Sequence, residues 1–167
     1  MAEMKVETIR KDRLRFTKNK LSANLIILSI VMNALYFVNI YRTDVGNYYY
    51  SLMIGASVVY NLVFMLVAFL ASEGVKNYKI GYGYAAVVLG LLQAGRIFYL
   101  PMNALNTPNP KVGAENTTVM TGGQFSFVAI CLGISAVLLI VAGVTGIMKT
   151  MTLNSYRAEL EKNSKRD

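Results

Sequence analysis

Four long apolar stretches dominate this chain of 167 residues and decide what it can fold into. They occupy residues 21–40, 51–71, 80–100 and 125–148. Each is close to the ~20 residues that an α-helix needs to cross a hydrocarbon layer of ~30 Å, at ~1.5 Å per residue. The expected fold is therefore an all-α membrane protein with a bundle of four transmembrane helices.

The composition leaves little material for a soluble domain. Hydrophobic residues make up 54% of the chain, the mean hydropathy is +0.42, and only 16% of residues are charged, against about 25% in a typical soluble protein. We expect three regions: a basic N-terminal segment (1–20), a four-helix transmembrane domain (21–148) and a basic C-terminal helix (149–167).

The distribution of Lys and Arg predicts the orientation of the chain. Fourteen of the 17 basic residues lie in the two terminal segments and in the short loop between the second and third stretches. Because basic residues concentrate on the cytoplasmic side, both termini and this loop are expected to be cytoplasmic in a multi-pass protein of the cell membrane. The net charge of +8 then follows from topology, and we expect no nucleic-acid partner.

Prolines mark the third loop as the longest connection. Pro101, Pro108 and Pro110 all fall within 101–124, where we expect the helix to have ended, because proline interrupts helical hydrogen bonding. An outer loop of this length is longer than most connections in a compact fold. This loop is either a covering or docking segment or a disordered segment.

Familiar catalytic groups are scarce in this sequence. The chain has no histidine, its single cysteine (Cys131) lies in the fourth stretch, and all acidic residues lie outside the apolar stretches. Histidine is the usual general base and zinc ligand near neutral pH, so we expect no enzyme, no cofactor and no metal site. An enzyme acting on lipid phosphate, using Arg96, Lys111 and Tyr99, is a disfavoured alternative.

Polar side chains inside the apolar stretches are the first group of candidate functional residues. One lies in each stretch, about 15 to 20 Å from the cytoplasmic end at ~1.5 Å per residue: Asn33, Asn61, Gln93 and Ser135. Amides facing lipid would lack hydrogen-bond partners, so these groups are expected to face one another as an intramembrane polar layer. Such a layer either holds the helices together or forms a site or pore for a small uncharged solute.

Arg96 is the one charged residue well inside an apolar stretch. It lies five residues before Pro101, near the outer end. We expect an outer-face charge whose guanidinium extends to the lipid headgroups while its stem covers apolar surface. An ion pair with Asp44 or Glu115 is the alternative.

Small residues recur in the third and fourth stretches and predict close helix packing, because glycine and alanine let two backbones approach. These candidate packing residues are Ala86, Gly90, Ala94, Ala129, Gly133, Ala142 and Gly146. The partner helix lies either within the same bundle or in another protein.

Taken together, these features favour a non-catalytic accessory or structural subunit of a larger integral membrane complex, such as a transporter. Its expected partners are membrane lipid and other integral membrane subunits, and a homo-oligomer is possible. The alternative is a small homo-oligomeric channel or carrier that uses the polar layer for an uncharged solute.

Overall fold

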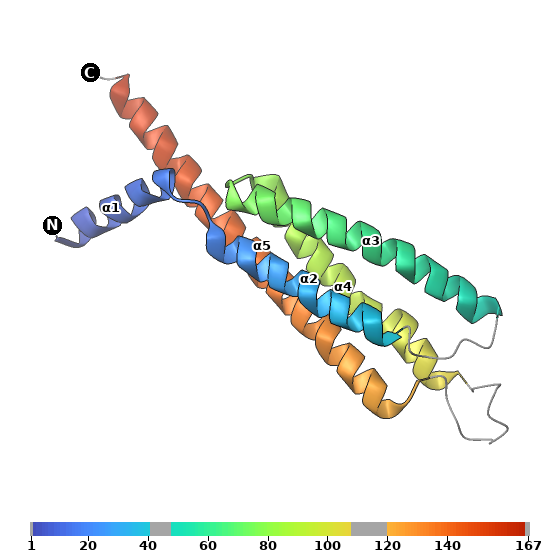
Figure 1. The fold of residues 1–167 in the computed structure, drawn as a ribbon. Coiled ribbons are helices and arrows are strands. Elements are labelled where there is room, and N and C mark those ends of the chain that lie inside the picture. Colours follow the sequence, from blue (N-terminus) through green and yellow to red (C-terminus); the bar gives the residue numbers. More distant parts are fainter. Residues whose placement is uncertain (1, 41–47, 108–119, 166–167) are drawn as a thin grey trace.

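The computed structural model describes residues 2–40, 48–107 and 120–165 as an all-helical protein (Figure 1). Over these ranges it contains five helices and no strand. The helices are α1 (Ala2–Phe16), α2 (Lys20–Ile40), α3 (Tyr48–Lys76), α4 (Ile80–Asn106) and α5 (Gly122–Ser164). The expected all-α fold is confirmed.

Helices α2 to α5 are each long and apolar enough to cross a membrane. They contain the four stretches expected from hydropathy, and α3, α4 and α5 extend beyond them. Many large apolar side chains on their outward faces are exposed, including Leu62 at 57% and Val137 at 61%. Apolar surface of this extent suits a lipid environment, as a multi-pass membrane protein requires.

The four long helices form a ring in which α3 lies opposite α5. Helix α5 packs against α4 and α2, and α3 packs against the same two helices from the other side. Two apolar clusters fill the interior. One is centred on Tyr36, Leu100 and Leu132, and the other on Ile26, Phe64 and Leu139. Each of the two clusters therefore packs residues from several helices into one part of the bundle interior.

Helices α4 and α5 approach most closely, and glycines make this possible. A Cβ atom added to Gly143 would lie 2.7 Å from the carbonyl oxygen of Gly83, and one added to Gly90 would lie 3.0 Å from the carbonyl oxygen of Ala136. These atoms belong to backbone and cannot move aside without shifting a helix. The absence of side chains at these positions therefore sets the distance between the two helices.

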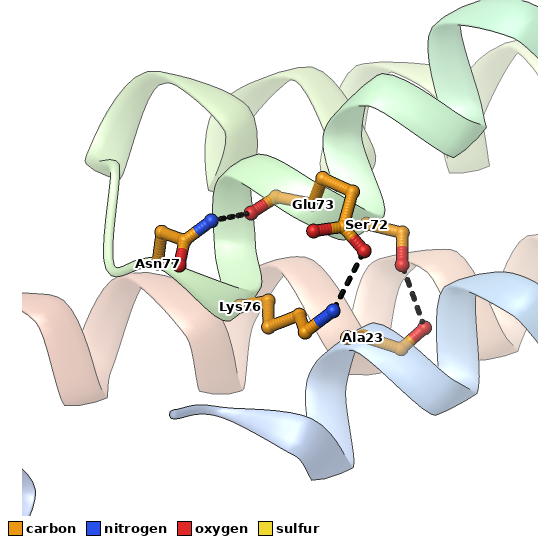
Figure 2. Close-up of polar contacts among 5 residues, drawn as sticks. All are labelled: Ala23, Ser72, Glu73, Lys76 and Asn77. Carbon is orange, nitrogen blue, oxygen red and sulfur yellow. Dashed lines mark hydrogen bonds and ion pairs between the residues drawn. The ribbon is translucent and has the colours of Figure 1, made fainter. Parts of the chain in front are cut away.

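A polar clamp ties the beginning of α2 to the end of α3, just before the turn that leads to α4; Figure 2 shows its contact between Ser72 and Ala23. The Ser72 hydroxyl donates to the carbonyl of Ala23 over 3.2 Å, and the backbone N–H of Asn19 donates to the carbonyl of Lys76 over 3.0 Å. In the turn itself Tyr78 has a φ of +55°, the left-handed conformation that commonly ends a helix. This clamp fixes the beginning of α2 beside the end of α3.

The expected helix end at Pro101 is wrong, because α4 continues through Pro101 to Asn106. Proline removes one backbone donor, and buried neighbours stabilise the continued helix. Leu100 and Ala104 belong to the same apolar cluster as Met120, whose N–H donates to the carbonyl of Ala104 over 3.1 Å. Pro108 and Pro110 lie outside the described residues.

Helix α5 continues far beyond the bundle. Its 43 residues correspond to about 65 Å, roughly twice the thickness of the hydrocarbon layer. Its C-terminal part projects from the bundle at the end where α1 lies, and α1 contacts it (Figure 1). The expected C-terminal helix is therefore the end of α5, continuous with the fourth span.

Candidate functional site

A polar cluster in the bundle interior, held together by hydrogen bonds and by contacts between a cation and aromatic rings, joins side chains from all four long helices. We call it the Arg96 cluster; its members are Ser57, Asn61, Asn33, Gln93, Ser135, Arg96, Tyr36 and Tyr60. Asn33, Asn61, Gln93 and Ser135 are each 0% exposed. The four residues of the expected polar layer therefore do face one another.

Amide groups form the first part of the Arg96 cluster. Asn33 on α2 donates through Nδ2 to Oδ1 of Asn61 on α3 over 3.1 Å, and it accepts from Nε2 of Gln93 on α4 over 2.8 Å. The same Nε2 lies 3.4 Å from the hydroxyl of Ser135 on α5, which donates to the carbonyl of Ser29 over 3.1 Å. One chain of hydrogen bonds thus crosses the whole bundle.

The expectation that Arg96 extends to the outer headgroups is wrong. The residue is 8% exposed, and its guanidinium points into the cluster. Nη1 donates to Oδ1 of Asn61 over 2.8 Å, and Nη2 donates to the hydroxyl of Ser57 over 2.6 Å. The guanidinium bonds to these acceptors in the interior, so the side chain does not extend to the headgroups. The alternative partners, Asp44 and Glu115, lie outside the described residues.

Two tyrosine rings flank the guanidinium. The Cζ atom of Arg96 lies 4.4 Å from the ring centre of Tyr36 and 4.6 Å from that of Tyr60. The faces of aromatic rings attract cations by about 2 kcal/mol or more per contact where water is excluded. These rings and the oxygens of Asn61 and Ser57 together offset part of the cost of removing the charge from water.

Four buried side-chain atoms on α2, α3 and α4 have no hydrogen-bond partner among the described residues. They are the hydroxyls of Tyr36 and Tyr60, Oε1 of Gln93 and Oδ1 of Asn39. A buried polar group without a partner costs about 1 to 3 kcal/mol. Such atoms are the natural places for a bound water or a ligand to attach.

A groove between α3 and α4 opens beside the cluster. Its volume is about 480 Å³, and Ser57, Tyr60 and Arg96 are part of its wall. Leu91 and Leu92 line it as well and are 60% and 50% exposed. The polar cluster is therefore reached from the apolar flank of the bundle.

Three of the expected packing residues on α4 and α5 do not lie in the tight interface. Ala86, Gly90, Ala142 and Gly146 are buried within the bundle, whereas Ala94, Ala129 and Gly133 are only half-buried. A Cβ atom added to Gly133 would meet nothing within 4 Å. Gly133 therefore has no close neighbour within the described part of its own fold.

Sequence reasoning missed Ser57, Tyr36 and Tyr60 as neighbours of Arg96, and Gly83 and Gly143 as packing positions. The spacing of these residues from the predicted polar residues could have identified those near Arg96. Tyr36 follows Asn33 by three residues, Ser57 precedes Asn61 by four, and Arg96 follows Gln93 by three. Residues at these spacings share one helix face.

Comparison with protein-family models, with curated proteins and with solved structures finds no match for this chain. The fold and the Arg96 cluster are thus the grounds on which a function can be proposed.

Proposed function

We propose that this chain is a non-catalytic accessory subunit of a larger integral membrane complex in the cell membrane, with a transporter as the favoured kind of complex. One observation carries the proposal: the outward face of α5 around Gly133 is an apolar hollow of about 400 Å³. This α5 hollow is lined by Ile130, Gly133, Ile134, Val137 and Leu138.

The α5 hollow suits the close approach of another helix. Glycine in a helix interior costs roughly 0.5 to 1 kcal/mol relative to alanine, and Gly83, Gly90, Gly143 and Gly146 offset this cost by tight contacts within the bundle. Gly133 makes no such contact with the described residues. A transmembrane helix of another subunit would use the space it leaves.

Internal hydrogen bonding of the polar layer favours this proposal over a channel or carrier. A solute passage would need the layer to open, whereas Asn33, Asn61 and Gln93 are fully buried and bonded to one another. Packing of the four helices explains these contacts without any transported solute.

The proposed topology places both termini in the cytoplasm. Lys149 donates through Nζ to Oδ1 of Asn19 over 3.1 Å, and the Asn19 N–H donates to the carbonyl of Lys76. The two basic tails and the basic turn thus meet at one end of the bundle. A single basic end supports the cytoplasmic assignment by the positive-inside rule.

The experiment is purification of the full-length protein from its native membrane in mild detergent, followed by crosslinking and native mass spectrometry. We expect the wild type to carry another membrane polypeptide and Gly133→Leu to lose it, because the leucine fills the α5 hollow. Gly55→Leu is the matched control, since Gly55 lies on α3 and a Cβ there also meets nothing within 4 Å.

Three outcomes would count against the accessory subunit. A strictly monomeric wild type in native-like lipid would show that the chain is not part of a complex. Equal loss of the polypeptide in Gly55→Leu shows that the α5 hollow is not the contact. Multiples of the chain's own mass, without another polypeptide, support the homo-oligomeric alternative instead.

A further inference from the structure

The C-terminal end of α1 lies close to the place where the chain enters the membrane. Helix α1 ends at Phe16, and α2, the first helix able to span a bilayer, begins at Lys20. Four residues of extended chain reach at most about 14 Å, and the N–H of Asn19 is bonded to the carbonyl of Lys76 at the end of α3. The end of α1 is thus within reach of the lipid headgroups, which begin where the apolar spans end.

The direction of α1 places the rest of the helix beside the bundle. Figure 1 shows α1 leaving the bundle at a steep angle to the long helices, so it does not continue along α2. Its contact is with the projecting part of α5, where Lys11 shares the wall of a small cavity with Thr152 and Tyr156. A helix that runs across the spans at their end has the position of an interfacial helix.

Ile9 and Phe16 form an apolar face on α1. They are seven residues apart, which is nearly two helical turns, so they lie on the same side of the helix. Their side chains are 68% and 81% exposed. Lys11 and Leu14 lie on the opposite side and are half-buried. The side of α1 away from its half-buried residues thus presents two large apolar side chains to its surroundings.

The half of α1 nearest the membrane is strongly basic. Residues 8–18 contain five basic residues and one acidic residue. The acidic residue, Asp12, is paired with Arg15 over 3.4 Å, so its charge is already offset. Arg10, Arg13 and Lys18 are exposed, and their side chains have no hydrogen bond or ion pair with the described residues. Three cationic groups are therefore available to bind something outside this part of the chain.

We propose that α1 lies on an anionic membrane surface at the basic end of the bundle. Ile9 and Phe16 insert at the boundary between headgroups and acyl chains, and Arg10, Arg13 and Lys18 lie among the anionic headgroups. A leaflet with net negative charge attracts these residues within the Debye length of about 8 to 10 Å. A purely zwitterionic leaflet has no net charge, so it offers the apolar contact without this attraction.

Tryptophan fluorescence tests the proposal. The chain contains no tryptophan, so Phe16→Trp places a single fluorophore on the apolar face of α1. The full-length variant is studied alone in nanodiscs of phosphatidylcholine, with or without phosphatidylglycerol, so the result does not depend on any other subunit. We expect emission at shorter wavelength with phosphatidylglycerol, and quenching there by lipid that carries bromine on its acyl chains. Both effects should weaken at about 1 M salt, where the Debye length falls to about 3 Å.

Matched variants separate the membrane surface from other causes. Ala158→Trp, at an exposed position on the projecting part of α5, should emit as a water-exposed tryptophan in both kinds of disc. Added to the tryptophan variant of α1, Arg10→Gln with Arg13→Gln should remove most of the wavelength shift. Arg157→Gln with Lys162→Gln removes the same charge from exposed positions of α5 and should leave the shift in place.

Three outcomes would overturn the proposal. The first is equal emission from Phe16→Trp in the two kinds of disc. The second is an equal loss of the shift in the two charge variants, which would show that the basic residues of α1 have no special part. The third is emission at short wavelength without quenching by brominated lipid, because the ring would then be covered by protein and not by the bilayer.

Discussion

At the scale of single residues, Arg96 shows how a charge can be held inside an apolar bundle. Its contacts with Asn61 and Ser57 require a planar donor with two nitrogens at fixed positions. Its contacts with the rings of Tyr36 and Tyr60 suit a flat cation that can approach two aromatic rings at once. Only arginine among the cationic side chains meets both requirements, since the lysine ammonium is a compact point charge.

Arg96→Lys should therefore destabilise the bundle although the charge is kept. We expect a loss of about 1 to 3 kcal/mol, because one hydrogen bond to a charged group and part of the ring contact disappear. Thermal unfolding of the purified protein in detergent measures this loss. Arg157→Lys, at an exposed position of α5, is the control and should leave the midpoint unchanged; an equal midpoint for Arg96→Lys contradicts the role of guanidinium geometry.

At the scale of helices, the α4 and α5 contact depends on where glycine lies on each face. Gly83, Ala86 and Gly90 follow one another at spacings of three and four residues, and all are buried. This spacing keeps them on one face of the helix. Gly143 lies against that face, whereas Gly133 on the same helix α5 lies outside the contact.

Gly143→Ala and Gly133→Ala make a matched pair on α5. Gly143→Ala should destabilise the chain by about 1 to 3 kcal/mol, because the new methyl group would collide with the backbone of α4. Gly133→Ala should be neutral or stabilising by up to about 1 kcal/mol, since alanine is the better helix former and has room. Unfolding of the purified chain in detergent distinguishes them, and equal effects would show that the α4 and α5 spacing does not depend on Gly143.

The sequence predicts which segments are helices far more directly than it predicts which side chains those helices bring into contact. Length and hydropathy predict all four spans, because each must satisfy its backbone within an apolar layer. Residue depth predicts that Asn33, Asn61 and Gln93 lie at one level. The burial of Arg96 and the continuation of α4 past Pro101 depend on side chains from other helices, such as Tyr36 and Met120, and no local pattern specifies those neighbours.

At the scale of the whole molecule, most basic residues of the described ranges lie at one end of the bundle. The turn after α3, the beginning of α2 and the projecting part of α5 all lie at the basic end, beside α1 (Figure 1). Helix α1 carries exposed Ile9 and Phe16 among its basic residues. Such a helix suits the surface of an anionic leaflet, which attracts basic residues by about 1 kcal/mol each.

Cysteine labelling of intact cells tests this orientation. The one native cysteine, Cys131, is 3% exposed, so the wild type should give little background with a membrane-impermeant maleimide. We expect Gly113→Cys, at a position outside the described residues, to react from outside, and Ala2→Cys and Asn163→Cys to react only after permeabilisation. The basic residues of the two tails and of the turn after α3 would each oppose translocation of their segment across the membrane. Labelling of either terminus in intact cells would show that the orientation is the reverse of the one proposed.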